Sequence, residues 1–259
     1  MTLPRLLMLC VLALTQAGCA GNPGCGSPGD GTTCTRVLFI GDSYTSVNDL
    51  PTVFADLAWS GGHRVDAGMD APGGDTLTEH AADPATAAAI ALEQWNIVVL
   101  QEQSQRPSNE QLRQTQMYPA VRQLDTAIRA DGAQPMYFLG WARRDGWPEA
   151  GLPDYASMQS AIDDGYLTIA TEEHAAVAPV GYAWAALLGQ DSPSDLWQAD
   201  GIHPTTTGTY LAACVFYAAI FKQSPEGLGY HADLSDDAAA RVQNVAATAV
   251  LADPREWGL

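Results

Sequence analysis

Basic residues are scarce in this chain. Its 259 residues include 12 Lys and Arg against 30 Asp and Glu, which gives a formal net charge of −18. Proteins that bind nucleic acid neutralise its phosphates with Lys and Arg, and electrostatic binding to anionic lipid needs the same residues. The composition therefore speaks against nucleic acid and lipid surfaces as partners. An acidic surface of this kind is typical of a protein whose net charge keeps it in solution.

Three other features are absent. No group of Cys and His residues has the spacing of a metal site, so we expect neither a metal nor a cofactor. No Gly-x-Ser-x-Gly motif is present, which speaks against the larger α/β-hydrolase fold. The chain also lacks internal repeats. Hydrophobic residues make up 47% of it and charged residues 16%, which suits one sizeable globular domain.

The N-terminus predicts export. Arg5 precedes an apolar run, 6–14, which is too short for a stable membrane span, and small residues then lead to Cys19. Residues 1–18 resemble a bacterial lipoprotein signal, and this resemblance implies that Cys19 is lipidated. A plain secretory signal is the alternative. We expect a cell-envelope lipoprotein, or a secreted or periplasmic protein, that touches the membrane only through its anchor.

Residues 19–34 are rich in Gly, Pro, Ser and Thr, which is typical of a tether. Two cysteines, Cys25 and Cys34, flank its most Gly-rich part. In an exported protein we expect them to form a disulfide that closes a small loop ahead of the first strand. Cys214 lies in an apolar helical stretch and is expected to be a small buried side chain.

Strand-like and helix-like segments alternate through residues 35–259. Three of the five candidate strands are apolar on both faces, as parallel strands covered by helices should be. The alternation predicts an α/β domain in which a doubly wound, five-stranded parallel sheet lies between helices. The expected strands are 37–40, 64–67, 97–100, 136–140 and 176–180, and the expected helices are 51–60, 84–95, 109–131, 155–174, 205–222 and 235–251.

A Gly-Asp-Ser block that ends in Ser43 follows the first expected strand, at the edge where ligands bind in open α/β sheets. Serine is a poor nucleophile unless a base lies within hydrogen-bond reach. Of the five histidines, only His203 has a carboxylate, Asp200, at a spacing that one tight turn can bring beside it. Asp200 would fix the tautomer of His203, whose other ring nitrogen would take the Ser43 proton. Together the two blocks predict acyl transfer.

These blocks resemble those of the SGNH, or GDSL-like, hydrolase superfamily, over residues 35–221. The resemblance implies a flavodoxin-like three-layer sandwich with Ser43 as nucleophile, His203 as base and Asp200 as the acid that orients it. It also implies that a Gly and an Asn from two middle blocks help to form the oxyanion hole.

The middle blocks match that pattern less closely. Residues 71–76 match the glycine block, so that the N–H of Gly74, or of Gly73, would face the oxyanion. In place of the expected Gly-x-Asn-Asp, the chain has Leu-Gln-Glu-Gln-Ser at 100–104, as in a divergent bacterial subfamily. Gln103 then stands at the Asn position and can donate the same hydrogen bond, and Gln101 is the competing candidate.

The loop after the fourth strand carries Trp141, Arg143 and Arg144. We expect these side chains to line the cleft, where they suit a sugar face or an anionic substituent. The sequence therefore predicts a serine esterase that acts on a small-molecule or carbohydrate ester, such as an O-acetyl group on a sugar. A lipase-like or thioesterase-like acyl hydrolase, and a glycan-binding surface lipoprotein without turnover, are the alternatives.

Overall fold

The computed structural model describes residues 22–26, 33–190 and 195–259. The predicted signal at 1–18 and the lipidation site Cys19 lie outside these ranges. Within them, no helix combines the length and the apolar character that crossing a membrane requires.

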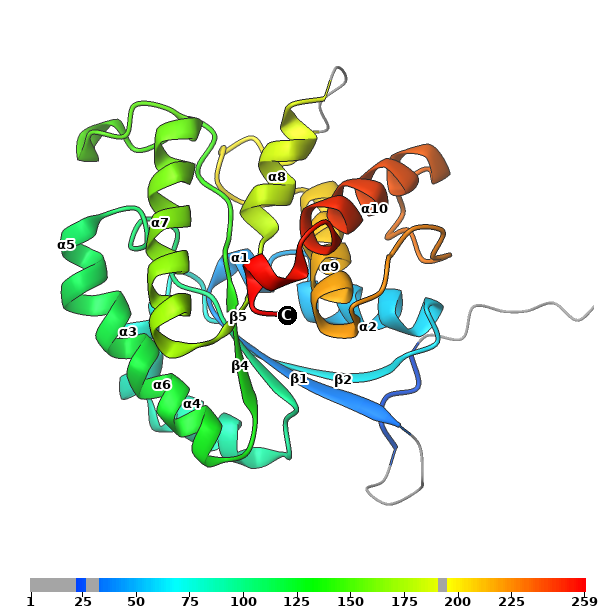
Figure 1. Cartoon of the computed structure of the whole chain (residues 1–259), viewed down its shortest axis with the longest axis horizontal. Helices are drawn as coiled ribbons and strands as arrows, with labels where there is room; N and C mark the ends of the chain where they lie inside the picture. The colour runs from blue at the N-terminus through cyan, green and yellow to red at the C-terminus, as the bar shows by residue number, and fades with distance from the viewer. Residues whose placement is uncertain (1–21, 27–32, 191–194) are drawn as a thin grey trace, which may run out of the picture.

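Five parallel strands form the sheet, in the order β2-β1-β3-β4-β5 (Figure 1). The chain runs from β1 outward to β2 and then crosses back to place β3 on the other side of β1. The carboxyl ends of β1 and β3 meet at this switch point, where ligands bind in doubly wound sheets. The predicted fold class is confirmed. The strands are β1 (Cys34–Ile40), β2 (Arg64–Asp70), β3 (Ile97–Leu100), β4 (Gln134–Phe138) and β5 (Ala176–Ala178).

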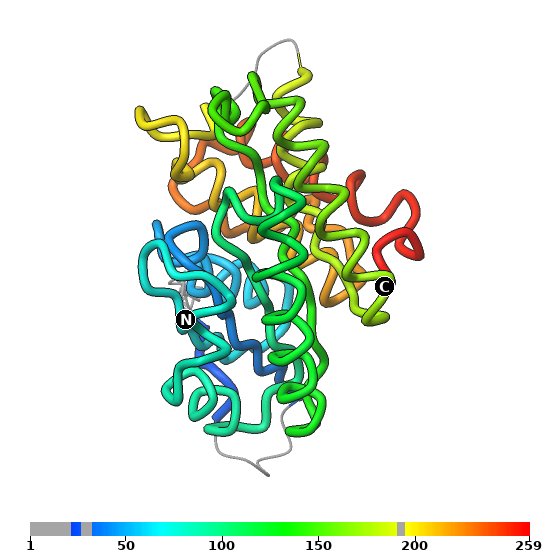
Figure 2. The backbone as a smooth tube through the Cα atoms, turned by 90° about the vertical axis from the view of Figure 1, so that its left-hand side faces the viewer, coloured from blue at the N-terminus to red at the C-terminus, as the bar shows by residue number. Residues whose placement is uncertain are grey.

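Helices cover both faces of the sheet. Val37 and Phe39 of β1 pack into one layer and Leu38 and Ile40 into the other, because successive strand residues face opposite sides. The first layer is on the right of Figure 1, and the second is on its left and toward the viewer in Figure 2. The first holds α2 (Leu50–Ser60), α8 (Val180–Leu188), α9 (Thr206–Phe221) and α10 (Asp236–Leu251), and the second holds α3 (Leu77–Ala82), α4 (Pro84–Leu92), α5 (Glu110–Leu112), α6 (Tyr118–Ala130) and α7 (Tyr155–Glu173).

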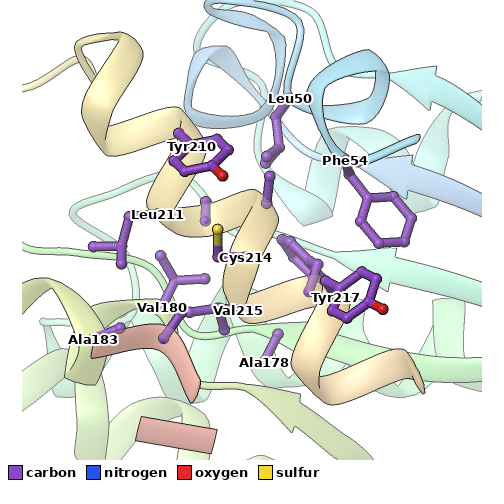
Figure 3. Packing of buried hydrophobic residues seen from close by; sticks show 14 of the residues in the cluster. Leu50, Phe54, Ala178, Val180, Ala183, Tyr210, Leu211, Cys214, Val215 and Tyr217 are labelled. Carbon is purple, nitrogen blue, oxygen red and sulfur yellow. The ribbon is translucent and has the colours of Figure 1, made fainter. Parts of the chain in front are cut away.

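Helix α9 is the centre of the larger core. Its side chains meet Leu50 and Phe54 of α2 on one side and Val180 and Ala183 of α8 on the other (Figure 3). Cys214 is a free cysteine inside this packing and is fully buried. Burial raises the pKa of its thiol, so the side chain is a small hydrophobic group, as predicted.

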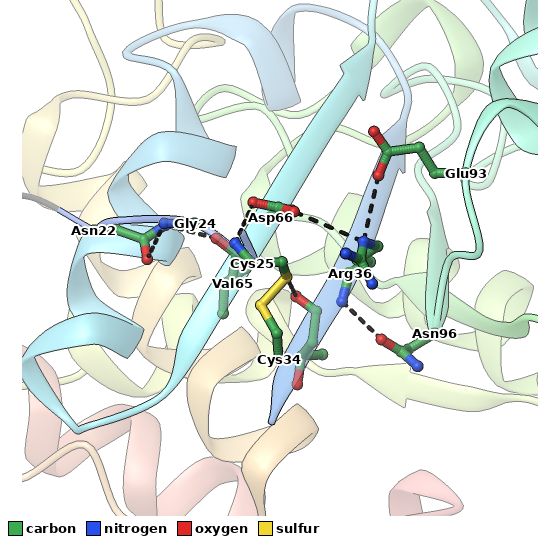
Figure 4. The surroundings of a disulfide bond; sticks show 10 residues. Asn22, Gly24, Cys25, Cys34, Arg36, Val65, Asp66, Glu93 and Asn96 are labelled. Atoms are coloured by element: carbon green, nitrogen blue, oxygen red, sulfur yellow. Dashed lines mark hydrogen bonds and ion pairs between the residues drawn. A yellow bond between two sulfur atoms is a disulfide. The ribbon is translucent and has the colours of Figure 1, made fainter. Parts of the chain in front are cut away.

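Cys25 and Cys34 form a disulfide, as the sequence predicts (Figure 4). The segment 22–26 is held on β2, because the Cys25 N–H donates to Asp66 Oδ1 at 2.8 Å and Asn22 Nδ2 donates to the Val65 carbonyl at 2.6 Å. The described residues 22–26 of the predicted tether thus pack against the domain, and β1 begins at Cys34.

The expected helix at 109–131 is wrong in one respect. It is divided into α5 and α6 by a π-helical turn, η1 (Arg113–Met117). Three α-helices of the described chain were not predicted from the sequence: α3, α8 and the four-residue α1 (Ser43–Ser46). Short helices carry no full period of apolar residues, and α8 continues the apolar run of β5 without a polar break. Pro179 separates the two, so β5 ends at Ala178 and not at residue 180.

Candidate active site

The predicted catalytic residues meet at the carboxyl edge of the sheet. Ser43 follows β1 and begins α1. Asp200 and His203 come from the connection between α8 and α9, which a main-chain bridge between Trp197 and Pro204 closes into a tight turn. Residues 160 positions apart in the chain thus come within hydrogen-bond distance.

Ser43, His203 and Asp200 form a continuous hydrogen-bonded relay. His203 Nε2 lies 3.0 Å from Ser43 Oγ, and His203 Nδ1 lies 2.6 Å from Asp200 Oδ2. The hydrogen bond from His203 lowers the pKa of Asp200 to about 2, so the carboxylate is charged at neutral pH. A charged Asp200 keeps the proton on Nδ1 and leaves Nε2 free to accept the serine proton.

The Asp200 turn is held from both sides. The second carboxylate oxygen of Asp200 accepts the main-chain N–H groups of Ile202, at 2.8 Å, and of His203, at 3.0 Å. Gly201, which lies between Asp200 and Ile202, has a φ of +70°, which glycine adopts without strain. Its carbonyl accepts the Arg144 N–H at 2.8 Å, and the Ile202 carbonyl accepts Trp141 Nε1 at 3.1 Å. The loop after β4 therefore supports the base.

These contacts give Trp141 a structural role in place of the substrate contact that the sequence predicts, whereas the substrate-binding role of Arg144 stays a prediction. The Trp141 indole is only 1% exposed and is stacked between Tyr44 and Trp184, with ring centroids 4.2 Å away on each side. The Arg144 guanidinium pairs with its exposed neighbour Asp145. The Arg143 guanidinium donates to Ser104 Oγ at 3.3 Å, and the Arg144 guanidinium lies against Gly201, next to Asp200.

Gln101 holds the Ser43 turn and has no amide proton left for an oxyanion. Its Oε1 accepts the Asp42 N–H at 2.8 Å and the Thr45 hydroxyl at 2.9 Å. Its Nε2 donates to Asp42 Oδ1 and to the Glu102 carbonyl, both at 2.8 Å. The same side chain occupies the space that a Cβ at Gly41 would need, which explains the glycine there.

Gln103 and Gly74 are the oxyanion donors that the geometry leaves open. Gln103 is half-buried. Its Oε1 accepts the Gln105 main-chain N–H at 3.0 Å, and its Nε2 makes one long contact, 3.4 Å, to Ser104 Oγ. Gly74 has a φ of +85° and lines one hollow together with Gln103. In the described chain, the main-chain N–H groups of Ser43 and Gly74 have no hydrogen-bond acceptor. These two N–H groups and the Gln103 Nε2 group are therefore available to a developing negative charge, and their role in the oxyanion hole stays a prediction.

Glu102 is a site residue that the sequence did not single out. Its Oε1 accepts the Leu77 N–H at 3.2 Å and the Gln103 N–H at 2.8 Å, so one carboxylate joins the Gly74 loop to the Gln103 loop. The side chain is 2% exposed, and burial raises its pKa to about 7. Only its neighbours in space reveal this role, because Leu77 is 25 residues away in the chain.

The buried Glu102 predicts a pH-dependent stability. Its folded pKa lies above its ordinary value of 4.5, so its contribution is fully present below pH 4.5 and is lost as pH rises through 7. We expect Glu102→Gln, which keeps the accepting oxygen, to gain stability relative to wild type on the order of 1–3 kcal/mol between pH 5 and pH 8. Urea unfolding at the two pH values measures this difference. The exposed Glu149→Gln is the control, and an equal pH response in both variants would contradict the role of Glu102.

His80 is a second buried group that motif reasoning missed. It is 3% exposed, and its Nε2 donates at 2.8 Å to the carbonyl of Gly41, the first residue of the Gly-Asp-Ser block. Its Nδ1 lies 3.1 Å from Thr86 Oγ1, which donates to Asp70 Oδ2 at 2.6 Å. This chain of contacts anchors the main chain that carries Ser43 to α4 and to the end of β2.

No protein-family model matches the chain, and no curated protein matches it either. Solved structures do. A protein from Slackia heliotrinireducens, described as an SGNH hydrolase, is 30% identical to this chain. The match covers 71% of this chain and 98% of that protein, with a TM-score of 0.60. The likeness therefore extends from the fold to the sequence.

Two further solved structures share the fold at lower identity. A DUF4886 family protein from Bacteroides uniformis is 19% identical over 85% of this chain and 95% of its own, with a TM-score of 0.70. A psychrotrophic esterase from a Pseudoalteromonas species is 16% identical over 73% of this chain and 97% of its own, with a TM-score of 0.52. At these identities, the matches show the arrangement of strands and helices alone.

Proposed function

This chain belongs to the SGNH hydrolase superfamily and is an ester-bond hydrolase, and we propose that it is a serine esterase that cleaves small acyl esters through an acyl-enzyme on Ser43. The observation that carries the proposal is the relay from Asp200 through His203 to Ser43, with contacts of 2.6 and 3.0 Å. A nucleophile, a base within reach of it and a group that orients the base are the parts that covalent acyl transfer needs.

The proposed reaction has two steps. In the first, Ser43 Oγ attacks the ester carbonyl while His203 Nε2 takes its proton, and the imidazolium then protonates the departing alcohol. The Ser43 and Gly74 N–H groups and the Gln103 amide stabilise the oxyanion in this step. In the second step, a water molecule gives a proton to His203 Nε2 and attacks the acyl carbonyl, and the imidazolium then returns that proton to Ser43 Oγ as the carboxylic acid departs. Asp200 stays charged throughout and stabilises the imidazolium.

Hydrolysis of a series of nitrophenyl esters tests this proposal. We expect the purified protein to cleave acetate and butyrate esters and to be much slower on long-chain esters, because the hollow that Gln103 lines is mainly polar and offers a long acyl chain little apolar surface on which to pack. A preference for long chains would favour the lipase-like alternative instead. No observation favours binding without turnover, since a binding protein has no use for an aligned base.

Export and lipid anchoring remain part of the proposal. The Cys25–Cys34 disulfide supports an oxidising compartment, where such bonds persist. A small-molecule or carbohydrate ester is the only partner that we propose.

Removing the Gln103 amide tests its part in the reaction. We expect Gln103→Ala to lower kcat by roughly ten- to a thousandfold with little change in KM, because the amide acts on the charge of the transition state. Steady-state kinetics on a nitrophenyl acetate measures both parameters. The control is Gln111→Ala, which removes an exposed amide from α5. An unchanged kcat in Gln103→Ala would remove this residue from the oxyanion hole.

A further inference from the structure

A hollow of about 530 Å³ lies next to two of the proposed oxyanion donors, Gly74 and Gln103, which are part of its lining. Its walls come from three parts of the chain: the start of α3 with the loop before it, the stretch from the loop after β3 to the π-helical turn η1, and the loop after β4. Gly74 and Gln103 are among the residues that line it, so it adjoins the place where the ester carbonyl is proposed to bind. Its volume lies within the range of small-molecule sites.

Three long polar side chains line this hollow without a partner. The Gln105 and Gln116 amides and the Arg106 guanidinium are half-buried, yet none of them has a hydrogen bond or close ion pair with another described residue. Polar groups in that position are bonded to water in the free protein, and a ligand's hydroxyl groups can replace such water molecules. Each amide offers a donor and an acceptor side by side, and so matches neighbouring hydroxyls on a ring.

Trp147 supplies an aromatic wall on a rigid loop. Its main chain pairs with Leu152 in both directions, at 2.7 and 3.2 Å. The preceding Gly146 has a φ of +69°, and a Cβ there would lie 2.5 Å from the carbonyl oxygens of Leu152 and Asp154. The indole is half-buried and packs against the core on this side of the sheet, which restrains it before any ligand arrives. A flat apolar face of this kind can pack against the C–H face of a sugar ring.

The charges of the hollow balance. Arg106 is its one cation, and Glu79, which also lines it, is its anion. The Glu79 carboxylate accepts the Thr76 N–H and hydroxyl, both at 2.8 Å, and these bonds lower its pKa, so it is charged at neutral pH. One positive and one negative group leave no net attraction for an anionic ligand. A neutral ligand that is rich in hydroxyl groups can accept a hydrogen bond from Arg106 and donate one to Glu79.

We propose that this hollow is a subsite for a neutral sugar ring, with Trp147 packing on the ring and Gln105, Arg106 and Gln116 binding its hydroxyls. The inference rests on the proposed esterase function and names its substrate class, an O-acylated neutral saccharide. It moves the sugar-binding role from the buried Trp141 to Trp147, six residues further along the same loop. A lipid acyl chain does not fit, because Leu112 and Trp147 are the only large apolar side chains in the lining.

Kinetics on two substrates tests the subsite. We expect the protein to cleave both an O-acetylated neutral xylo-oligosaccharide and a nitrophenyl acetate. Trp147→Ala and Gln116→Ala should each lower the ratio of kcat/KM for the saccharide to kcat/KM for the nitrophenyl ester by about ten- to a hundredfold, mainly through KM. Gln114→Ala is the matched control, because this exposed amide lies on the same turn outside the hollow. Its ratio should equal that of wild type.

The possible results separate the subsite from the esterase itself. Cleavage of the nitrophenyl ester without cleavage of the saccharide would overturn the subsite and leave the esterase intact. So would an unchanged ratio in both variants, or a Trp147→Ala variant that gains activity on longer acyl chains, since the hollow would then hold the acyl group. Failure of wild type on both substrates would overturn the esterase, and the subsite with it.

Discussion

Ser43→Ala is expected to lower kcat for short-chain nitrophenyl esters by about four to six orders of magnitude. The substitution removes the oxygen that forms the acyl-enzyme. The remaining catalysis comes from a water molecule that His203 activates and from the oxyanion donors. Because the alcohol and acyl groups are bound by other residues, KM should change only a few-fold. Steady-state hydrolysis at neutral pH measures both parameters.

Ser46→Ala is the control for this experiment. Ser46 lies on the same short helix, and its hydroxyl donates to the Asp42 carbonyl at 3.4 Å, but it has no contact with His203. This variant should keep activity close to that of wild type. If Ser43→Ala were as active as Ser46→Ala, another residue would be the nucleophile.

Asp200→Asn should lower kcat by about two to four orders of magnitude. Asn can still accept the N–H groups of Ile202 and His203 through one oxygen, so the turn is retained. At the position of Oδ2, however, an NH₂ group would face His203 Nδ1 and favour the tautomer that carries its proton on Nε2. That tautomer cannot accept the Ser43 proton.

The control for Asp200→Asn is Asp195→Asn, which removes one exposed carboxylate from the same connection. It should leave kcat within a few-fold of wild type, because Asp195 does not contact His203. Full activity of Asp200→Asn at neutral pH would mean that the main chain alone orients the base. A circular dichroism spectrum and a melting curve show whether each variant is folded.

The relay was predictable because each of its parts is local in the sequence. Ser43 comes directly after an apolar strand, and Asp200 and His203 are three residues apart, so strand ends and one turn suffice to place them. The parallel sheet was predictable for a related reason, since alternating strands and helices favour a doubly wound arrangement.

The rest of the site depends on packing that no local pattern records. Trp141 follows a strand end, as a cleft residue would, but its indole turns inward because Tyr44 and Trp184 offer stacking partners. Gln101 and Gln103 are alike in sequence, and only the four hydrogen bonds of Gln101 separate them. Glu102 contacts a loop 25 residues away, which no spacing rule predicts.

Covalent labelling tests whether His203 activates Ser43. An alkyl fluorophosphonate should add one phosphonyl group per protein molecule, and peptide mass spectrometry should find it on Ser43. Labelling should be lost in Ser43→Ala and strongly slowed in His203→Ala, because the base must take the proton of Ser43 before its oxygen attacks. An adduct on another residue, or labelling of Ser43 at an equal rate without His203, would contradict the proposed relay.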